Sequence, residues 1–335
     1  MTHRFPIKEI AQQSGLSTAT VDRVINGRAN VSQQTKTRVS TAIEELKLQE
    51  GQLAARGMRM FVDFVVEAPR RFSSKIRNAV EQVIPHFSPA VIRPRFTFQE
   101  EMTEAQTIAH IDRIIGRGSS GVFLKVRDLP AIHDAVTRLR DKKIPVVTMF
   151  TDLQTERLAY VGADNYQAGQ TAAYLMLQSL GATAKGPILM IKSQDSFAGE
   201  ELRAAGFKAT IAGHGLRLMH IAGASGLTTN TAVQIKARAV DFGPLAGVYS
   251  MGGGNRATLE TLAAVGLEAG VFVGHDLDEE NIILLRGGRL HYVLEHDLCQ
   301  DLETGFAHVC HAHGLGPAPT KGTSVIQVVT PFQLP

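Results

Sequence analysis

The sequence predicts an α/β chain in which a small all-α N-terminal segment precedes a core of two doubly wound parallel-sheet lobes. From Phe61 onward, apolar strand-like segments such as FVDFVVEA and GVFLKV alternate with amphipathic helical segments. This alternation is typical of parallel sheets with helices on both faces. The expected strands number more than about ten, which exceeds a comfortable single sheet and favours two lobes. Residues 1–48 differ, because their apolar residues follow helical spacing alone.

The segment 7–26, IKEIAQQSGLSTATVDRVIN, has the spacing of a helix-turn-helix. Ile7, Ile10 and Ala11 share one face of a first helix. Gly15 can adopt the positive φ of a tight turn, and the Ser17 hydroxyl can cap a second helix. Apolar residues at helical spacing then continue through the second helix and through a third one capped by Ser32: Leu16, Val21, Val24, Ile25, Val39, Ala42, Ile43 and Leu46.

The outward face of the second helix predicts DNA recognition. Thr18, Ala19, Asp22 and Arg23 point away from the apolar face, and the first residues of such a helix reach base edges in the major groove. Arg23 can form two hydrogen bonds with a guanine, and Thr18 or Ala19 can touch a thymine methyl. The alternative is a small helical hairpin whose polar face is only solvated.

Positive charge is concentrated in the same region. Residues 1–60 contain nine Lys and Arg against five Asp and Glu, whereas the 335-residue chain carries a net charge of only +3. The N-terminus is polar and no apolar run reaches the ~18 residues of a membrane span, so we expect a cytoplasmic protein with no membrane partner. Two cysteines, Cys299 and Cys310, are too few for a disulfide framework and fit a reducing compartment.

The sequence contains no motif that favours catalysis or metal binding. His308 and His311 lie one helical turn apart beside Cys310 and His313, but no carboxylate or second cysteine completes a tetrahedral site. We therefore expect no metal. GxSxG, HExxH and Ser-His-Asp groupings are absent, so we expect no enzyme activity and no cofactor.

Residues 1–48 resemble the DNA-binding headpiece of the LacI/GalR (lactose/galactose repressor) family. That family has the pattern IxxIAxxxGVSxxTVSRVLNxxxxVSxxTRxxVxxAxxxLxY. This sequence matches it at Ile7, Ile10, Ala11, Gly15, Ser17, Thr20, Val21, Arg23, Val24, Asn26, Val31, Ser32, Thr35, Val39, Ala42 and Leu46. It departs at Asp22, where the family usually has Ser near a phosphate, and at Lys47 and Leu48, where the family has an aromatic-containing LGY.

The resemblance implies a set of DNA-contacting residues and a hinge. The implied contacts come from the second helix, the start of the third and the hinge: Ser17, Thr18, Ala19, Thr20, Asp22, Arg23, Asn26, Ser32, Arg56 and Met58. The family's hinge helix, PNxxARSL, wedges a leucine into the minor groove. Ala55, Arg56 and Met58 match its ARxL portion, so Met58 is the expected wedge. The Pro-Asn start is missing and Gly57 lowers helix propensity, so Leu53 is an alternative wedge and a flexible linker is an alternative to the hinge.

The core resembles the effector-sensing core of the same family, which has a periplasmic binding protein type I-like fold. The matches are IPVV at 144–147, VGADNYQAGQTAA at 161–173, RxxGF at 203–207 and VGHD at 273–276. They imply chain crossings between the lobes near Gly162, His296 and Val325. The expected domains are a headpiece over 1–48, a hinge over 49–60 and an effector-binding and dimerisation core over 61–335, with lobe 1 at about 61–162 and 297–324 and lobe 2 at about 163–295 and 325–335.

Doubly wound sheets bind ligands beyond the carboxyl ends of their strands, here in the cleft between the lobes. The resemblance places the effector contacts at those points: Arg71, Phe72, Phe150, Asp152, Glu201, Ser250, Asp276 and His296. An aromatic ring under a sugar's apolar face and a carboxylate accepting from its hydroxyls suit this mixture. Other roles stay open: Asp276 can cap a helix, His296 can be a satisfied core histidine, and Phe72 or Phe150 can be core packing.

The sequence therefore predicts a sequence-specific transcriptional repressor. We expect a homodimer on a pseudo-palindromic operator, with operator affinity controlled by a small effector, expected to be a sugar. One alternative is a solute-binding protein of similar fold. Another is a regulator with a non-sugar or phosphorylated effector, since Arg71, Lys75 and the glycines at 252–254 can approach an anion.

Overall fold

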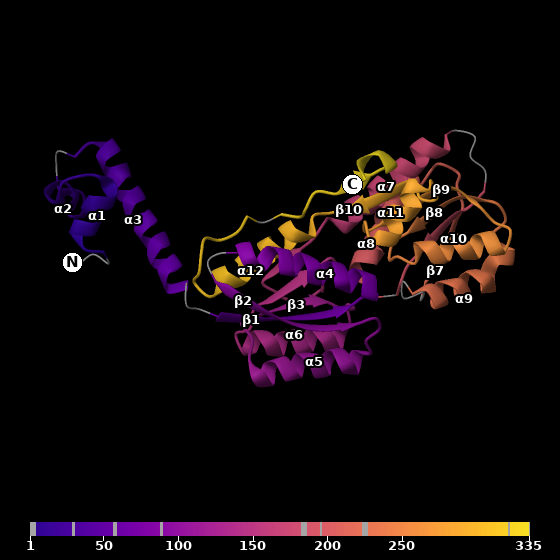
Figure 1. The fold of residues 1–335 in the computed structure, drawn as a ribbon, viewed down its shortest axis with the longest axis horizontal. Helices are drawn as coiled ribbons and strands as arrows, with labels where there is room; N and C mark the ends of the chain where they lie inside the picture. The colour runs from indigo at the N-terminus through magenta and orange to yellow at the C-terminus, as the bar shows by residue number, and fades with distance from the viewer. Residues whose placement is uncertain are drawn as a thin grey trace.

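The computed structural model describes residues 5–28, 31–55, 59–87, 90–181, 186–194, 196–222, 227–320 and 322–334 of the chain. Figure 1 shows three helices at the N-terminal end, set apart from a body that contains two sheets. The predicted α/β class with an all-α headpiece and two parallel-sheet lobes is confirmed.

The headpiece consists of α1 (Ile7–Ser14), α2 (Thr18–Ile25) and α3 (Gln33–Ala55). Gly15 ends α1 at φ 63°, a conformation that glycine adopts without a Cβ penalty. The Ser17 hydroxyl accepts from the Thr20 N–H and caps α2. These helices share a small core of buried side chains: Phe5, Ile10, Ala11, Val21 and Val39.

The third helix is longer than the sequence pattern predicted. A separate hinge was expected over 49–60, but α3 continues to Ala55 and the first strand begins at Arg59. Glutamate, leucine, lysine, glutamine and alanine dominate residues 44–55, and their high helix propensity outweighs the single Gly51. The predicted hinge contacts Arg56 and Met58 lie outside the described residues, as does the side chain of the alternative wedge, Leu53.

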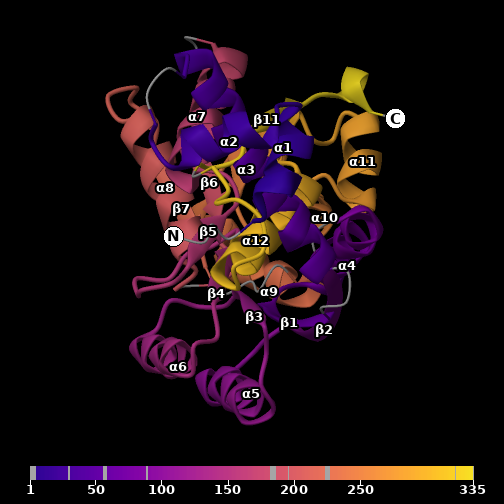
Figure 2. The ribbon, with the colours of Figure 1, turned by 90° about the vertical axis from the view of Figure 1, so that its left-hand side faces the viewer.

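Lobe 1 is built on a five-stranded parallel sheet with the order β2-β1-β3-β4-β5. Its strands are β1 (Arg59–Glu67), β2 (Val91–Gln99), β3 (Gly121–Lys125), β4 (Val146–Met149) and β5 (Ala159–Val161). Figures 1 and 2 show α5 and α6 together on one face, with α4 and α12 on the other. The helices are α4 (Arg70–Val83), η1 (Ile84–His86), α5 (Glu104–Arg117), α6 (Pro130–Asp141) and α12 (Leu298–Ala312).

Lobe 2 is built on a six-stranded sheet with the order β11-β10-β9-β8-β6-β7. Its strands are β6 (Ile188–Ile191), β7 (Leu218–Ile221), β8 (Leu245–Ser250), β9 (Ala269–His275), β10 (Tyr292–Glu295) and β11 (Gln327–Val329). Only β11 runs antiparallel, because the chain re-enters this sheet from lobe 1 at its edge. The helices are α7 (Asn165–Leu180), α8 (Ala198–Ile211), α9 (Thr228–Arg238), η2 (Ala239–Asp241), α10 (Asn255–Ala264), α11 (Glu279–Arg286) and η3 (Pro331–Gln333).

Three crossings connect the lobes: from β5 to α7, from β10 to α12, and from α12 to β11. The first and third lie side by side, because the Ser324 N–H donates to the Gly162 carbonyl at 3.0 Å and Ala163 pairs with Ser324 as an isolated parallel bridge. Residues at the carboxyl ends of strands from both sheets line one cleft, among them Phe150 after β4 and Asp276 after β9.

Candidate functional site

The outward face of α2 carries polar and small side chains. Thr18, Ala19 and Arg23 are exposed, whereas Val21 between them is fully buried in the headpiece core. An eight-residue helix with one buried face and short side chains at its first turn has the shape of a recognition helix.

The Asp22 carboxylate is turned toward partners on its own surface. Its Oδ1 accepts from Asn26 Nδ2 at 2.8 Å, and its Oδ2 lies 3.2 Å from Arg28 Nη1. These two donors stabilise the negative charge of Asp22 on α2. The hydroxyls of Ser17 and Ser32 accept from the N–H groups of Thr20 and Thr35, both at 3.1 Å, so they cap α2 and α3.

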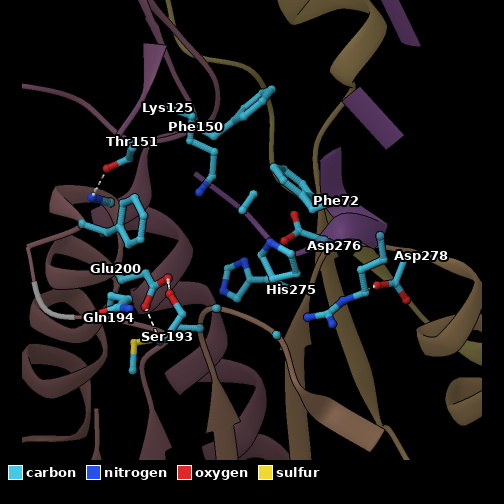
Figure 3. Close-up of a pocket in the computed structure, with 18 of the residues that line it drawn as sticks. Phe72, Lys125, Phe150, Thr151, Ser193, Gln194, Glu200, His275, Asp276 and Asp278 are labelled. Carbon is cyan, nitrogen blue, oxygen red and sulfur yellow. Dashed lines mark hydrogen bonds and ion pairs between the residues drawn. The ribbon is translucent and has the colours of Figure 1, made fainter. Parts of the chain in front are cut away.

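A cavity of about 880 Å³, including the open space at its mouth, lies between the lobes. Figure 3 shows Lys125 reaching toward the space enclosed by Phe72, Glu200 and His275. Side chains from both lobes line the cavity, so a ligand there would touch both walls of the cleft.

Five of the eight predicted effector residues line this cavity: Arg71, Phe72, Phe150, Asp276 and His296. The Phe72 and Phe150 rings meet edge to face at 5.5 Å, and Phe150 lies 5.2 Å from the His296 ring. They form a continuous aromatic wall of the kind that packs against the apolar face of a sugar ring.

The other three predicted residues lie outside the cavity. Asp152 belongs to lobe 1 and contacts residues of its own lobe: it accepts from Thr148 Oγ1 at 2.6 Å and pairs with Arg157. Glu201 follows the inward-facing position of α8 by one residue, so it points outward and pairs with Lys192 at 2.5 Å. Ser250 is fully buried and donates to the Gly253 carbonyl.

Two cavity residues have left-handed backbone conformations that non-glycine residues rarely adopt. Phe150 has φ 64° and Asp276 has φ 65°. The Asn165 side chain donates to the Phe150 carbonyl at 3.1 Å, and the Asn281 side chain donates to the Asp276 carbonyl at 2.7 Å. Strain held in place by such bonds is common at binding sites, because it aims one side chain into a cavity.

Two charged residues that line the cavity were not predicted from the sequence: the half-buried Lys125 and the buried Glu200. Lys125 Nζ donates to the Glu67 carbonyl at 3.0 Å and lies 4.4 Å from the centre of the Phe197 ring. Burial lowers the pKa of Lys125, and nearby Glu200 opposes that shift. Burial raises the pKa of Glu200, although it accepts from the Ser193 N–H and hydroxyl. Lys125 at the end of a strand and Glu200 at the start of a helix were the available signals.

Arg203 is a further charged residue of the cavity, is buried, and belongs to the RxxGF segment at 203–207. Its guanidinium donates to Asn165 Oδ1 and to the Met251 carbonyl, both at 2.7 Å. A close helix crossing sets its position: a Cβ on Gly169 of α7 would lie 2.0 Å from the Arg203 carbonyl oxygen. Only glycine fits there, so α8 can approach α7 closely enough to hold Arg203 in place.

Two neutral residues complete the lobe 2 wall. Burial lowers the pKa of His275 well below its ordinary value of 6.5, and Arg203 adds to the shift. The Asn255 side chain donates to Asn281 Oδ1 at 2.9 Å, while its buried Oδ1 has no hydrogen-bond partner among the described residues. A ligand hydroxyl would satisfy that acceptor.

Several polar contacts join the lobes around the cavity. Arg71 Nε lies 3.0 Å from Asp278 Oδ2, and Lys75 Nζ lies 2.6 Å from Glu295 Oε1. On the opposite rim, the Gly199 N–H donates to Thr151 Oγ1 at 3.0 Å. These contacts hold the two walls against each other.

The family models agree with this division into headpiece and core. The model for "Bacterial regulatory proteins, lacI family" matches residues 6–49, and the model for "Periplasmic binding protein domain" matches residues 77–295, well over half of the chain. The chain carries a lacI-family domain at residues 6–49 and belongs to the periplasmic binding protein domain family through its core. The predicted resemblance is confirmed over both parts of the sequence.

Curated relatives of this lacI-family chain are transcriptional regulators. It is 30% identical over 126 residues to the HTH-type transcriptional regulator TreR of Salmonella typhimurium, an alignment that covers 37% of this chain and 39% of that protein. It is 23% identical over 220 residues to an HTH-type transcriptional regulator of Lachnoclostridium phytofermentans, which covers 63% of each. The chain thus matches less than two thirds of the length of these relatives.

The fold of the core of this lacI-family chain also occurs in solved structures. GanP, a glucose-galactose binding protein from Geobacillus stearothermophilus, has a TM-score of 0.68 and 17% identity, and the match covers 83% of this chain and 99% of that one. At this identity, the likeness shows the two-lobed fold.

The histidine cluster near the end of α12 divides among separate partners. His311 Nδ1 lies 3.3 Å from the Gly316 carbonyl, His313 Nε2 lies 2.6 Å from the Ser120 carbonyl, and Cys310 is buried beside Met60. Within the described part of this lacI-family chain, no three His, Cys, Asp or Glu residues gather to hold a metal ion. The helices in that part also include none with the length and apolar character of a membrane span.

Proposed function

We propose that this lacI-family chain is a transcriptional repressor that binds operator DNA through α2 and changes its operator affinity when a neutral sugar occupies the cavity between the lobes. The main support for this proposal is that one chain contains both an exposed recognition helix and a cavity lined by residues of both lobes. A ligand that touches both walls favours one lobe arrangement, and by linkage it must change the affinity for DNA that prefers the other.

The charges of the cavity favour a neutral effector over a phosphorylated one. The lining cations already have partners: Arg71 pairs with Asp278, Lys125 donates to the Glu67 carbonyl, and Arg203 donates to two oxygens. Lys75, which was considered for anion binding, pairs with Glu295. Acidic side chains line the cavity in greater number: Glu67, Glu100, Glu200, Asp276, Asp278 and Glu280. A phosphate would meet net negative charge.

The aromatic wall and the free polar atoms suit a polyhydroxylated ring. Phe72 and Phe150 offer apolar surface, while Asp276 and Asn255 Oδ1 offer acceptors to hydroxyls. The named function of GanP, glucose-galactose binding, agrees with this chemistry. We propose a cytoplasmic homodimer, because one recognition helix reads too few base pairs and two-fold symmetry doubles the site. A solute-binding protein would have no function for the headpiece. A sugar-modifying enzyme would convert its ligand chemically, so measuring turnover distinguishes it from a regulator.

A ligand screen followed by DNA binding tests the proposal. Thermal unfolding would be measured with D-glucose, D-galactose, D-xylose, myo-inositol and glucose 6-phosphate. A bound sugar at a hundred times its Kd adds roughly 2.7 kcal/mol of stability. An operator selected from random duplexes would then be titrated with and without the binding sugar. We expect a shift with a neutral sugar, none with the phosphate, and a changed operator affinity.

Two variants locate the site. Asp276→Ala should lose sugar binding and keep operator binding, because Asp276 lines the cavity. Glu201→Gln is the matched control, since this neighbouring acid on lobe 2 pairs with Lys192 outside the cavity. Equal sugar affinity in both variants, chemical conversion of the sugar, or no shift with any compound would contradict the proposal.

A further inference from the structure

Asp301 is a buried carboxylate that lies between the effector cavity and the chain crossings. It belongs to the first turns of α12 and is only 4% exposed. His296 Nδ1 lies 2.6 Å from its Oδ2, and Ser324 Oγ donates to its Oδ1 at 2.6 Å. One side chain thus bonds the second crossing, at His296, to the third, at Ser324.

This arrangement fixes the proton on His296. An ionised carboxylate only accepts hydrogen bonds, so Nδ1 of His296 must carry the proton that it shares with Asp301. In the neutral ring, Nε2 is then an acceptor. No described residue bonds Nε2. His296 lines the effector cavity, whereas Asp301 lines a separate outer cavity together with Ser324 of the third crossing. Because Nδ1 is bonded to Asp301, Nε2 is the ring nitrogen left for a ligand in the effector cavity.

The bonds continue from Asp301 to the remaining crossing. The Ser324 N–H donates to the Gly162 carbonyl at 3.0 Å, and Gly162 follows β5 in the first crossing. A contact at His296 is therefore connected by three hydrogen bonds to every segment about which the lobes can turn. The lobes have no other covalent connection within the described chain.

We propose that Asp301 is a positioning residue that holds His296 with Nε2 as the acceptor for an effector hydroxyl, and that the Asp301–Ser324 bond conveys this contact to the third crossing. This inference rests on the proposed function, because it names how the same cavity is connected to lobe movement. Asp301 itself does not touch the effector. Its two oxygens have separate roles, so the two bonds can be broken separately.

The proton position can be measured without any ligand. Nitrogen-15 NMR of the full-length protein distinguishes a protonated Nδ1 from a protonated Nε2, and His296→Gln assigns the signal. We expect the Nδ1-protonated form in the wild type and in Ser324→Ala, and a mixture in Asp301→Ala. A wild type with the proton on Nε2 would overturn the role given to Asp301.

The coupling is measured with the selected operator and the sugar from the D-glucose, D-galactose, D-xylose and myo-inositol panel that binds. Asp301→Ala should weaken sugar binding about tenfold, as expected when a buried hydrogen-bonded carboxylate is removed. Ser324→Ala keeps the bond between Asp301 and His296. It should change sugar affinity less than about threefold, while reducing the sugar-induced change in operator affinity about fivefold.

Thr304→Ala is the matched control for Ser324→Ala. Thr304 lines the same outer cavity, and its hydroxyl donates to the Gln300 carbonyl within α12. We expect wild-type sugar affinity and wild-type coupling from it. Wild-type coupling in Ser324→Ala would overturn the connection to the third crossing. A wild type that binds none of the sugars counts against the proposed function, and the NMR experiment still decides the position of the proton.

Discussion

Arg23 is an exposed side chain on α2 whose partner should be a base. Replacing Arg23 with alanine removes two hydrogen bonds to one base and should weaken operator binding by about 1–3 kcal/mol. Fluorescence anisotropy with the selected operator measures this loss. Sugar-induced thermal shifts should not change, because Arg23 lies in the headpiece.

Arg113→Ala is the control for lost positive charge, because Arg113 is an exposed arginine on α5 of lobe 1. It should leave operator affinity unchanged. A loss of both DNA and sugar binding in Arg23→Ala would mean that Arg23 supports folding rather than recognition.

His275 makes the stability of the protein depend on pH. The folded protein keeps His275 neutral because burial lowers its pKa well below 6.5, whereas the unfolded chain binds that proton near pH 6.5. The contribution of His275 to the free energy of unfolding is therefore complete above pH 6.5 and is lost as the pH falls below it. Urea unfolding at about pH 7.5 and about pH 5.5 should show a smaller loss in His275→Gln than in the wild type. Equal losses would refute this assignment.

Single residues of the cavity were predictable where they directly follow the end of a strand. Phe150 and Asp276 follow strands, and both line the cavity. The family resemblance placed Asp152 and Glu201 at the effector, but a shift of one or two residues along the chain turns a side chain away from the cavity. Lys125 was not recognised, because a lysine at a strand end is usually solvated, whereas here residues of both lobes cover it, Glu67 and Phe72 from lobe 1 and Phe197 from lobe 2.

At the scale of elements, the crossing of α7 and α8 positions the charged wall of the cavity. A Cβ on Gly206 would lie 2.1 Å from the Tyr166 carbonyl oxygen, as close as the Cβ on Gly169 would lie to Arg203. The backbones of α7 and α8 are therefore in direct contact, and a backbone cannot move aside as a flexible side chain could.

Gly169→Ala should overpack this crossing and lower the free energy of unfolding by about 1–3 kcal/mol or more. Urea unfolding provides the measurement. Gly116→Ala on α5 is the control, since its Cβ would have nothing within 4 Å and alanine favours a helix by about 0.8–1.0 kcal/mol over glycine. A Gly169→Ala protein as stable as Gly116→Ala would mean that the helices separate without cost.

The elements themselves were largely predictable. Alternating strands and helices gave the two sheets, and glycine and serine positions gave the helix-turn-helix. The end of α3 was not predicted, because residues of high helix propensity continue beyond position 48, where the headpiece pattern ends. The antiparallel direction of β11 was not predicted, because it depends on where the chain returns from lobe 1 to the sheet of lobe 2.

At the scale of the whole molecule, ion pairs between the lobes contribute to the lobe arrangement seen here. Lys75 lies on α4 of lobe 1, and its partner Glu295 ends β10 of lobe 2. Both are mostly buried, so salt screens this pair less than an exposed one.

Lys75→Gln should destabilise the arrangement with the lobes together by about 1 kcal/mol. Small-angle X-ray scattering should show a larger radius of gyration. Sugar affinity should fall about fivefold, because fewer molecules have the lobes together in the arrangement that binds the sugar. Arg77→Gln is the matched control, because Arg77 stacks on Phe96 and Phe98 within lobe 1 alone. Identical scattering from Lys75→Gln and the wild type would contradict this role.

The headpiece and the two-lobed class follow from the amino-acid sequence, because they depend on periodicity and turn residues that are local in the chain. The family resemblance added Phe72 and Phe150 as candidates for the cavity wall. Which charges line the cavity and which face solvent depends on the packing of the two lobes. Lys125 ends β3 in lobe 1, whereas Glu200 and Arg203 lie on α8 in lobe 2, and Asp301 joins His296 to Ser324 across the crossings. Burial and hydrogen bonding between distant segments give these residues their roles, and a linear pattern does not contain such contacts.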